Sequence, residues 1–338
     1  MKKKKATIII TSILLIILIP VLSVTITNAV QKINSKIEYN KYKNIELTNV
    51  GDYSADLKRF LIPKAMSGVG IKVSDLDGEL IPNSANINTA FTEKVQFVVT
   101  LCNAKEVDNK LEFLLFLDNK QIPYSINNDK TEIWNYSIYL PAFSYANLLV
   151  EVDKSNLNDN VNIHDIWFFC EQLADTKTTL ENRQPYFSTD YHLILTSNGS
   201  AHWSKILTEN TVKTDADENL IKKFDLKTTI TCGKASINQY TVSAKANKEL
   251  TANIELYNKR NDEKYQTFIV LNGRAIPLTE NGDSILWTSS ENTVHNFSFK
   301  FTMPNNIGHG KIYAVSFPII DTAENLPFTS ERMNVEVE

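Results

Sequence analysis

The sequence predicts an all-β protein in which two tandem antiparallel β-sandwich domains follow an N-terminal transmembrane or signal helix. The 338 residues contain many short runs of Val, Ile, Thr, Tyr and Phe, bounded by Asn, Asp, Lys and Gly, as strands and turns require. Beyond the N-terminus no amphipathic pattern of helical period is sustained. Short strands without intervening helices form antiparallel sandwiches rather than parallel sheets.

An internal repeat indicates that the sandwich is duplicated. Residues 111–124 (LEFLLFLDNKQIPY) recur as residues 265–278 (YQTFIVLNGRAIPL). In both copies an apolar strand runs into a polar turn, 118–119 or 272–273, followed by a basic residue and Ile-Pro. Asp, Asn and Gly tolerate the positive φ angles of tight turns, so each copy is predicted to be a β-hairpin.

The repeat extends on both sides of this hairpin. Upstream, an alternating strand ends at Asn103 in the first copy and at Asn258 in the second. An offset of about 150 residues is too long for a solenoid unit and predicts a duplicated domain. Downstream, we match Trp134 with Trp287, YSIYLP (136–141) with FKFTMP (299–304), and Leu148–Val152 with Ile312–Phe317.

The repeat sets the domain boundaries. We expect an extracellular stalk over residues 31–64, a first sandwich over 65–207, a linker over 208–226 and a second sandwich over 227–338. Residues 192–195 are predicted to form a strand that turns at Asn198-Gly199 and completes the first sandwich as an extra hairpin. The linker is expected to hold one helical turn capped by Thr214 or Asp215.

The N-terminus (residues 1–30) predicts a membrane anchor or a signal peptide. Lys2 to Lys5 precede a segment without charge, whose apolar part runs from Thr7 to Val24. This is longer than the 7–15 residues of a signal-peptide core and suits a spanning helix of about 20. We expect residues 6–30 to span the cell membrane once, with the C-terminal domains outside. The alternative is cleavage near Ala29, which would release a secreted protein.

Charge and cysteine content narrow the function classes. The formal net charge is −4, and without the four lysines at positions 2–5 the remainder of the chain carries −4 − 4 = −8. An acidic chain without a basic cluster argues against nucleic-acid binding. The Lys/Asn-rich, Cys-poor composition resembles that of bacterial proteins. Cys102 and Cys170 either form a disulfide or, as we favour because their repeat counterparts are not Cys, are buried free thiols.

The sequence contains no specific catalytic motif, and we predict no catalytic residue, no metal and no cofactor. Its five histidines form no metalloprotease pair. Asp190, His192 and His202 lie close in sequence, and we interpret them as surface residues of the predicted hairpin rather than an acid–base or metal site. Residues 75–79 (DLDGE) lack the full ligand spacing of a calcium loop and are interpreted as a solvated turn.

Aromatic residues provide the candidate binding site. Trp134 and Trp287 are assigned to the two cores because aromatic side chains dominate cores. Four other aromatic residues cluster in the unrepeated segment, where they form either an exposed platform for a partner or a cover over the seam between the domains. These candidate binding residues are Tyr186, Phe187, Tyr191 and Trp203.

The duplicated strand–turn–strand pattern of residues 111–124 and 265–278 resembles bacterial extracellular immunoglobulin-like or fibronectin-type modules. The resemblance implies a non-catalytic surface or envelope interaction protein whose domains bind another envelope protein or a glycan. One alternative is an envelope-polymer hydrolase with its site around residues 181–207. Another is an accessory subunit of a membrane complex, for which the N-terminal helix would have to persist.

Overall fold

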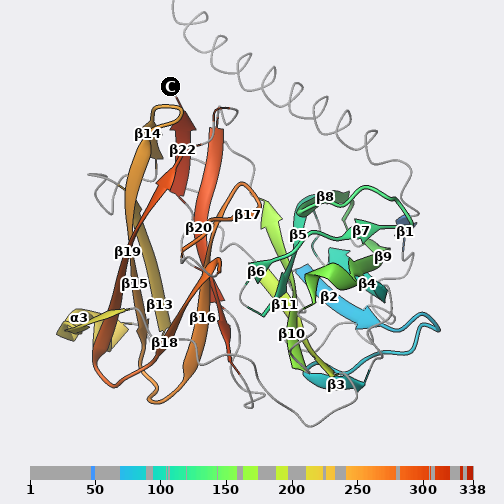
Figure 1. Cartoon of the computed structure of the whole chain (residues 1–338), viewed down its shortest axis with the longest axis horizontal. Coiled ribbons are helices and arrows are strands. Elements are labelled where there is room, and N and C mark those ends of the chain that lie inside the picture. Colours follow the sequence, from blue (N-terminus) through green and yellow to red (C-terminus); the bar gives the residue numbers. More distant parts are fainter. Residues whose placement is uncertain are drawn as a thin grey trace, which may run out of the picture. The chain divides into compact units, whose positions relative to one another are not determined.

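The computed structural model shows a nearly all-β chain (Figure 1). It describes residues 47–49, 69–88, 94–103, 105, 107–118, 120–142, 144–157, 163–173, 188–196, 211–223, 226–232, 241–278, 282–303, 305, 309–319, 328–329 and 333–337. The predicted anchor and the turn at Asn198-Gly199 lie outside these residues. Within them, no helix has the length and apolar character needed to cross a membrane.

Two sheets pack face to face to form a first sandwich. One has the strand order β1-β9-β4-β2, with β7 beside β9, and the other has the order β3-β11-β10-β5-β6, with β8 beside β5. The strands are β1 (Leu47–Asn49), β2 (Val69–Ser74), β3 (Ala85–Asn88), β4 (Lys94–Asn103), β5 (Asn109–Leu117), β6 (Lys120–Gln121), β7 (Ser125–Ile126), β8 (Asn135–Leu140), β9 (Ser144–Asp153), β10 (Ile163–Leu173) and β11 (Ser188–Thr196).

A second sandwich repeats this plan. Its sheets have the orders β12-β19-β15-β13 and β14-β22-β20-β16-β17, with β18 beside β16 and β21 beside β20. The strands are β12 (Val212–Asp215), β13 (Leu226–Cys232), β14 (Thr241–Ala244), β15 (Glu249–Asn258), β16 (Lys264–Leu271), β17 (Arg274–Ala275), β18 (Ser284–Thr288), β19 (Thr293–Thr302), β20 (His309–Pro318), β21 (Phe328–Thr329) and β22 (Met333–Val337).

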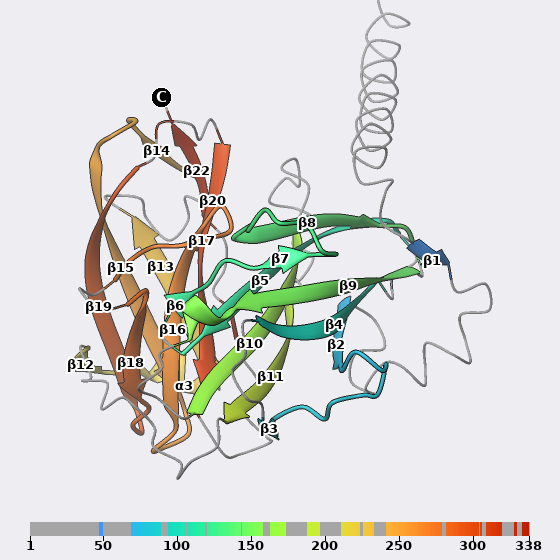
Figure 2. The same cartoon turned by 45° about the vertical axis from the view of Figure 1, so that its right-hand side comes forward.

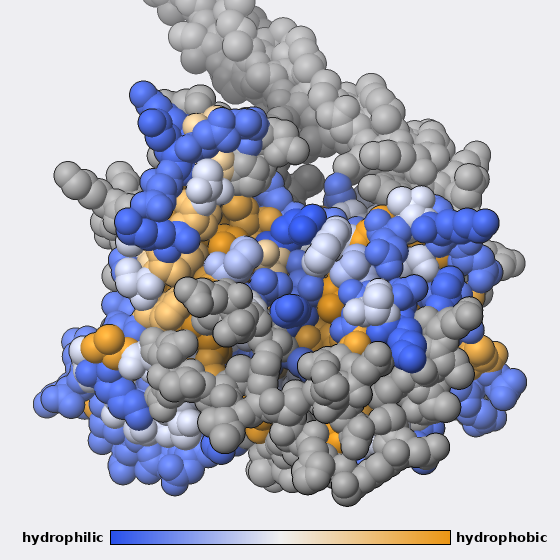
Figure 3. Space-filling view, viewed as in Figure 1, coloured by the Kyte–Doolittle hydropathy of each residue, from blue (hydrophilic) through white to orange (hydrophobic). Residues whose placement is uncertain are grey.

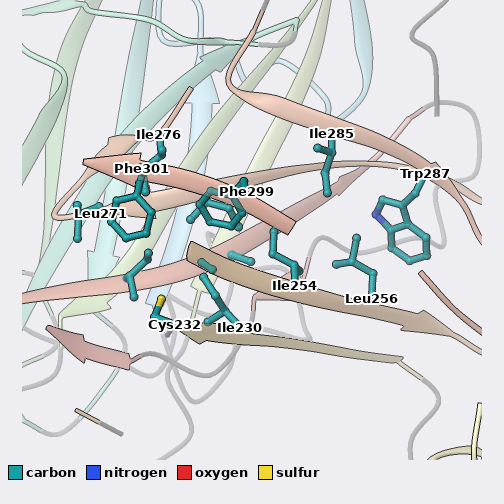
Figure 4. Packing of buried hydrophobic residues seen from close by; sticks show 14 of the residues in the cluster. Ile230, Cys232, Ile254, Leu256, Leu271, Ile276, Ile285, Trp287, Phe299 and Phe301 are labelled. Atoms are coloured by element: carbon teal, nitrogen blue, oxygen red, sulfur yellow. The ribbon is translucent and has the colours of Figure 1, made fainter. Parts of the chain in front are cut away.

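Each sandwich encloses its own apolar core. In the second sandwich, β13, β15 and β19 of one sheet face β16, β18 and β20 of the other (Figure 4). Trp287 is fully buried there, as the sequence predicts, and stacks on Tyr265 at 4.9 Å between ring centroids. In the first sandwich, Phe97 of β4 meets Phe168 of β10 edge to face at 5.3 Å. The predicted class, antiparallel sheets packed as β-sandwiches, is confirmed.

The ladder registers show which strands of the two sandwiches are equivalent. Leu101 of β4 lies opposite Ala146 of β9, and its repeat partner Leu256 of β15 lies opposite His295 of β19. Strand β9 therefore corresponds to β19. In the same way β8 corresponds to β18 and β10 to β20, because they flank the repeated strands β5 and β16. The parallel pairs β3–β11 and β14–β22 also match.

The predicted repeat is correct through the hairpin and displaced by one strand beyond it. Residues 136–141 begin in β8, whereas residues 299–304 begin in β19, the counterpart of β9. Trp287 pairs with Tyr265, and Ile138 pairs with Leu111, which is the repeat counterpart of Tyr265. Ile138 is therefore the equivalent of Trp287, and Trp134 is not. Apolar and polar residues alternate in the same way in neighbouring strands of a sandwich. When loop lengths differ, an alignment based on residue spacing can therefore be displaced by one whole strand.

The predicted linker is partly structured. Residues 212–215, assigned to it from sequence, form β12, which extends the second sandwich by pairing with β19. The expected helical turn is α3 (Glu218–Lys223), and its N-cap is Asp217, whose carboxylate accepts the N–H of Leu220 at 2.7 Å. Thr214 and Asp215, the predicted caps, lie in the strand instead. A short alternating strand flanked by polar residues gives the same sequence signal as a linker.

The turns of the repeated hairpin are built alike. Asp118 and Asn272, the first turn residues, have φ angles of 51° and 50°. Asp118 exchanges bonds with Asp165: its N–H donates to that carbonyl at 2.8 Å, and its carboxylate accepts that N–H at 3.0 Å. Asn272 repeats both bonds with Lys311, at 3.0 and 2.8 Å. The polar residues at these positions thus tie each hairpin to its neighbouring strand.

A buried asparagine closes the loop between β4 and β5. The Asn103 side chain is fully buried and satisfied by five hydrogen bonds. The two N–H groups of its amide are shared among the carbonyls of Val107 (2.8 Å), Leu140 (3.1 Å) and Pro141 (2.9 Å), and its oxygen accepts from the Lys105 N–H (3.1 Å) and the Asn109 amide (2.7 Å).

Replacing Asn103 by alanine is expected to destabilise the protein by about 2–4 kcal/mol, because buried backbone groups would lose their partner. Urea denaturation would measure the change. The control is Asn88→Ala at the exposed end of β3, which should change stability by less than about 0.5 kcal/mol. Equal effects of the two substitutions would contradict a structural role for Asn103.

Candidate functional site

The repeated hairpin strands are buried on both faces. In β5 every residue from Leu111 to Leu117 is buried, and in β16 the same holds from Tyr265 to Leu271. Phe113 and Ile269 face the core of their own sandwich. Alternate residues face the other way, into a second apolar cluster. This explains why residues 113–117 and 268–271 are continuously apolar, where a strand with one solvent-exposed face would alternate.

The second cluster joins the two sandwiches, and we call it the sandwich joint. It is formed by Leu114, Phe116, Trp167 and Phe169 of the first sandwich with Phe268, Val270, Tyr313, Val315 and Phe317 of the second. Phe116 lies centrally, with its ring centroid 4.5 Å from that of Phe268 and 5.2 Å from that of Phe317.

The two halves of the joint use equivalent positions. In the hairpin repeat Leu114 corresponds to Phe268, and Phe116 to Val270. Trp167 lies opposite Phe116 in the ladder, and Tyr313 lies opposite Val270, so these two also correspond. The contact is therefore of the isologous kind, in which one face meets a copy of itself, as at twofold dimer interfaces.

The joint is large enough to influence the stability of both sandwiches. Eight of its nine side chains are less than 4% exposed, and the ninth, Trp167, is 6% exposed. Full burial of a large apolar side chain contributes about 1.5–3 kcal/mol, so the gross contribution is on the order of 10 kcal/mol. A domain is stable by only about 5–15 kcal/mol, so we expect the two sandwiches to unfold together.

Gln121 provides the polar rim of the joint, at the point where β6 meets β17 (Figure 2). Its side-chain nitrogen donates to the Gly273 carbonyl at 2.8 Å, and its side-chain oxygen accepts the Ala275 N–H at 2.6 Å. Its own N–H donates to the carboxylate of Asp283 at 3.2 Å. One amide thus satisfies two backbone groups of the other sandwich and fixes the register of the contact.

Trp134 is a rim residue and not a core residue, which corrects the sequence-based assignment. Its ring is half-buried and lies beneath the guanidinium of Arg274, 3.9 Å from the ring centroid. Asn135, the next residue, donates to Glu112 at 2.7 Å. Both contacts lie beside the hairpin of the second sandwich. The approach there is close, because a Cβ added to Gly273 would lie 2.5 Å from the Glu112 carboxylate and still closer to the Asn135 amide.

An Asp–His cluster lies at one end of the joint. The His192 ring stacks on Trp167 at 4.1 Å, and Trp167 stacks on Phe317 at 4.7 Å. The Nε2 atom of His192 bonds the Asp165 carboxylate at 2.8 Å, and its Nδ1 atom lies 3.4 Å from the Ser84 hydroxyl. Burial raises the pKa of the Asp165 carboxyl, and the His192 bond opposes that shift. The cluster positions the aromatic stack of the joint.

Of the four predicted binding residues, the structure describes one, Tyr191. Tyr191 is 4% exposed and donates its hydroxyl to the Ile81 carbonyl, so it lacks the exposure that an aromatic platform needs. Tyr186, Phe187 and Trp203 lie outside the described residues. The face of β11 to which Tyr191 points is covered, which an alternating sequence does not reveal, and the binding role of the four residues stays a prediction.

The interpretation of Asp190 and His192 as surface residues is also corrected. His192 is only 6% exposed, and Asp190 lies beside Phe169 in the ladder on the face of the joint. His202 lies outside the described residues. Cys102 and Cys170 are free and buried, as favoured from sequence, and so is Cys232. Within the described ranges no group of three His, Cys, Asp or Glu side chains could hold a metal ion.

Asp190 is expected to make stability fall as pH rises. Burial raises the pKa of its carboxyl to about 7, whereas an unfolded Asp has a pKa of about 3.9. The folded state therefore binds the proton more tightly, and between about pH 4 and pH 7 stability decreases by on the order of 2–4 kcal/mol. Asp190→Asn should be more stable than the wild type at pH 8 and equal to it near pH 4, as measured by urea denaturation. A difference that is independent of pH would contradict this prediction.

Comparison with known proteins adds little. No family model matches the chain, and no curated protein sequence matches it. One similar solved structure is the crystal structure of red sea bream transglutaminase, with 8% identity and a TM-score of 0.22. The match covers 84% of this chain and 34% of that protein, so the chain spans about a third of its length. A likeness this low carries no argument about fold or activity.

Proposed function

We propose that this protein is a non-catalytic extracytoplasmic interaction protein that presents two related immunoglobulin-like domains as one rigid unit. The observation that carries the proposal is the sandwich joint, in which equivalent faces of the two sandwiches are buried against each other. A flexible tether would let two domains reorient, whereas a buried aromatic contact of this size fixes their spacing. Loops at fixed spacing suit the recognition of another envelope protein or a glycan.

The strand order supports the immunoglobulin-like part of the proposal. In the first sandwich, β3 pairs in parallel with β11, and β10, β5 and β8 follow across the same sheet. The opposite sheet holds β9, β4 and β2. The second sandwich has the same order with β14, β22, β20, β16 and β18 facing β19, β15 and β13. Two sheets joined by such crossed connections are the plan of immunoglobulin-like sandwiches.

The geometry around Ser84 supports a structural role over a catalytic one. A nucleophile and its base lie about 2.6–3.2 Å apart, whereas the Ser84 hydroxyl is 3.4 Å from His192. The Ser84 N–H, which could face a substrate in an active site, donates to the His192 carbonyl at 2.7 Å. His192 is fixed between Asp165 and the Trp167 ring. These bonds hold β3 against β11.

Membrane attachment is the second part of the proposal. The apolar segment of residues 6–30, preceded by four lysines, is proposed to anchor the chain with its sandwiches outside the cell. Fractionation of a Gram-positive host, intact-mass analysis and protease treatment of whole cells test this. We expect the full-length mass in the membrane fraction and release of the sandwiches by external protease. A chain found in the cytosol and protected from protease would overturn the proposal, and a mass beginning near Val30 would replace the anchor by secretion.

A further inference from the structure

The turn between β2 and β3 is closed by its own hydrogen bonds, and we call residues 75–80 the β2–β3 tip. The Asp75 carboxylate accepts the N–H groups of Asp77 and Glu79 at 3.0 and 2.8 Å. The Asp75 backbone bonds Glu79 and Gly78 at 3.0 and 3.2 Å. Ser74 and Leu80 then form a β-bridge. With its backbone groups paired in this way, the tip is held in one conformation.

This closed turn holds two leucines in solvent. Leu76 is 58% exposed and Leu80 is 56% exposed. Of the four large apolar side chains that are exposed in the described part of the chain, two therefore lie within one five-residue stretch. Figure 1 shows the turn after β2 projecting beyond the strands. Hydrophilic side chains predominate among the described residues in the same view, and apolar and hydrophilic side chains lie together at that edge (Figure 3).

The charge around the two leucines limits the partner. Asp75, Asp77 and Glu79 alternate with the leucines, and no Lys or Arg occurs between Lys72 and Lys94. An acidic tip is repelled by anionic lipid headgroups and by nucleic acid. A protein pocket with apolar walls and a Lys/Arg rim complements both features, because apolar insertion supplies affinity and the rim supplies orientation.

We propose that the β2–β3 tip inserts Leu76 and Leu80 into an apolar pocket, rimmed by Lys or Arg, on another extracytoplasmic protein. The proposal rests on the proposed interaction function and deepens it by naming the contact surface and the partner chemistry. Preorganisation favours this contact, since the turn is already ordered and binding costs little conformational entropy.

Site-specific photocrosslinking in intact cells tests the proposal on the full chain. A benzophenone amino acid replaces Asp77 at the tip or, as a control, Lys213 on β12, which is also exposed. We expect position 77 to crosslink one extracytoplasmic protein and position 213 not to do so. The crosslink should be lost in Leu76→Asn/Leu80→Asn and retained in Val212→Asn, a variant of an equally exposed apolar residue elsewhere.

Binding of the purified partner then tests the chemistry. The double variant Asp77→Asn/Glu79→Gln should bind about tenfold more weakly than the wild type at 0.15 M salt. At 0.5 M salt the difference should be much smaller, because salt screens the attraction between the acidic tip and the Lys/Arg rim of the partner. Thermal melting should be unchanged in Leu76→Asn/Leu80→Asn, since both side chains are exposed. An unchanged melting temperature excludes unfolding as the reason why that variant loses binding.

The outcomes separate this proposal from the broader one. A crosslink that survives in Leu76→Asn/Leu80→Asn, or binding of the wild type to phosphatidylglycerol vesicles instead of a protein, overturns the tip proposal. A crosslink from position 213 but none from position 77 also overturns it, while the interaction function stands. Absence of crosslinks to any extracytoplasmic protein from either position counts against both.

Discussion

Phe116→Ala is expected to destabilise both sandwiches, although Phe116 belongs to the first. The side chain is fully buried in the sandwich joint, where it contacts Phe268 and Phe317 of the second sandwich. Truncating a buried Phe costs about 3–5 kcal/mol, because the transfer free energy is lost and a cavity remains. Urea denaturation followed by Trp fluorescence should show one transition in the wild type and a lower midpoint in the variant.

A double-mutant cycle separates the contact across the joint from general loss of packing. Phe116→Ala combined with Phe268→Ala should show a coupling free energy of about 0.5–1.5 kcal/mol, as aromatic pairs in contact do. The matched control combines Phe268→Ala with Phe97→Ala, which removes a side chain from the core of the first sandwich. That pair should be additive within about 0.5 kcal/mol. Additivity of the joint pair would mean that the two rings do not interact in solution.

Gly273→Ala is expected to cost about 3 kcal/mol or more at the rim of the joint. Gly273 has a φ angle of 73°, where an L side chain is strained by about 1 kcal/mol. An added Cβ would also lie 2.5 Å from the Glu112 carboxylate and 2.8 Å from the Cγ atom of Asn135, so these two side chains of the first sandwich must move and lose the hydrogen bond between them. Denaturation midpoints would measure the loss.

Gly78→Ala is the matched control for this substitution. Gly78 has a φ angle of 86°, and a Cβ added there would meet no atom within 4 Å, so this position carries the backbone strain without the close approach. It should cost only about 1 kcal/mol. The difference between the two glycines therefore reports the approach of the two sandwiches. Equal costs would show that the hairpin at Gly273 does not pack against the first sandwich.

The sequence predicted those parts of the fold that depend on local chemistry. The turns at residues 118 and 272 were found because positive φ restricts the residue types that fit there. The strand class followed from composition. Strand equivalence beyond the hairpin was mistaken, because alternation repeats from strand to strand and only the ladders fix which strands correspond.

The two repeated strands carry a sequence signal for the sandwich joint. Continuous apolar runs at 113–117 and 268–271 indicate strands with two buried faces, and a single sandwich needs only one buried face per strand. The second face of each strand covers the other sandwich. By contrast, the contacts of Gln121 and of the Arg274–Trp134 pair join residues far apart in the chain, and no local pattern marks them.

Native-state hydrogen exchange of Phe116→Ala tests the central claim, that the two sandwiches are one cooperative unit, most directly. The account predicts that amides of β16 and β20 in the second sandwich lose protection together with those of β5 and β10. A destabilisation of about 3–4 kcal/mol corresponds to roughly a 10²–10³-fold faster exchange in both sandwiches. Faster exchange confined to the first sandwich, with β16 and β20 unchanged, would show that the joint does not couple them.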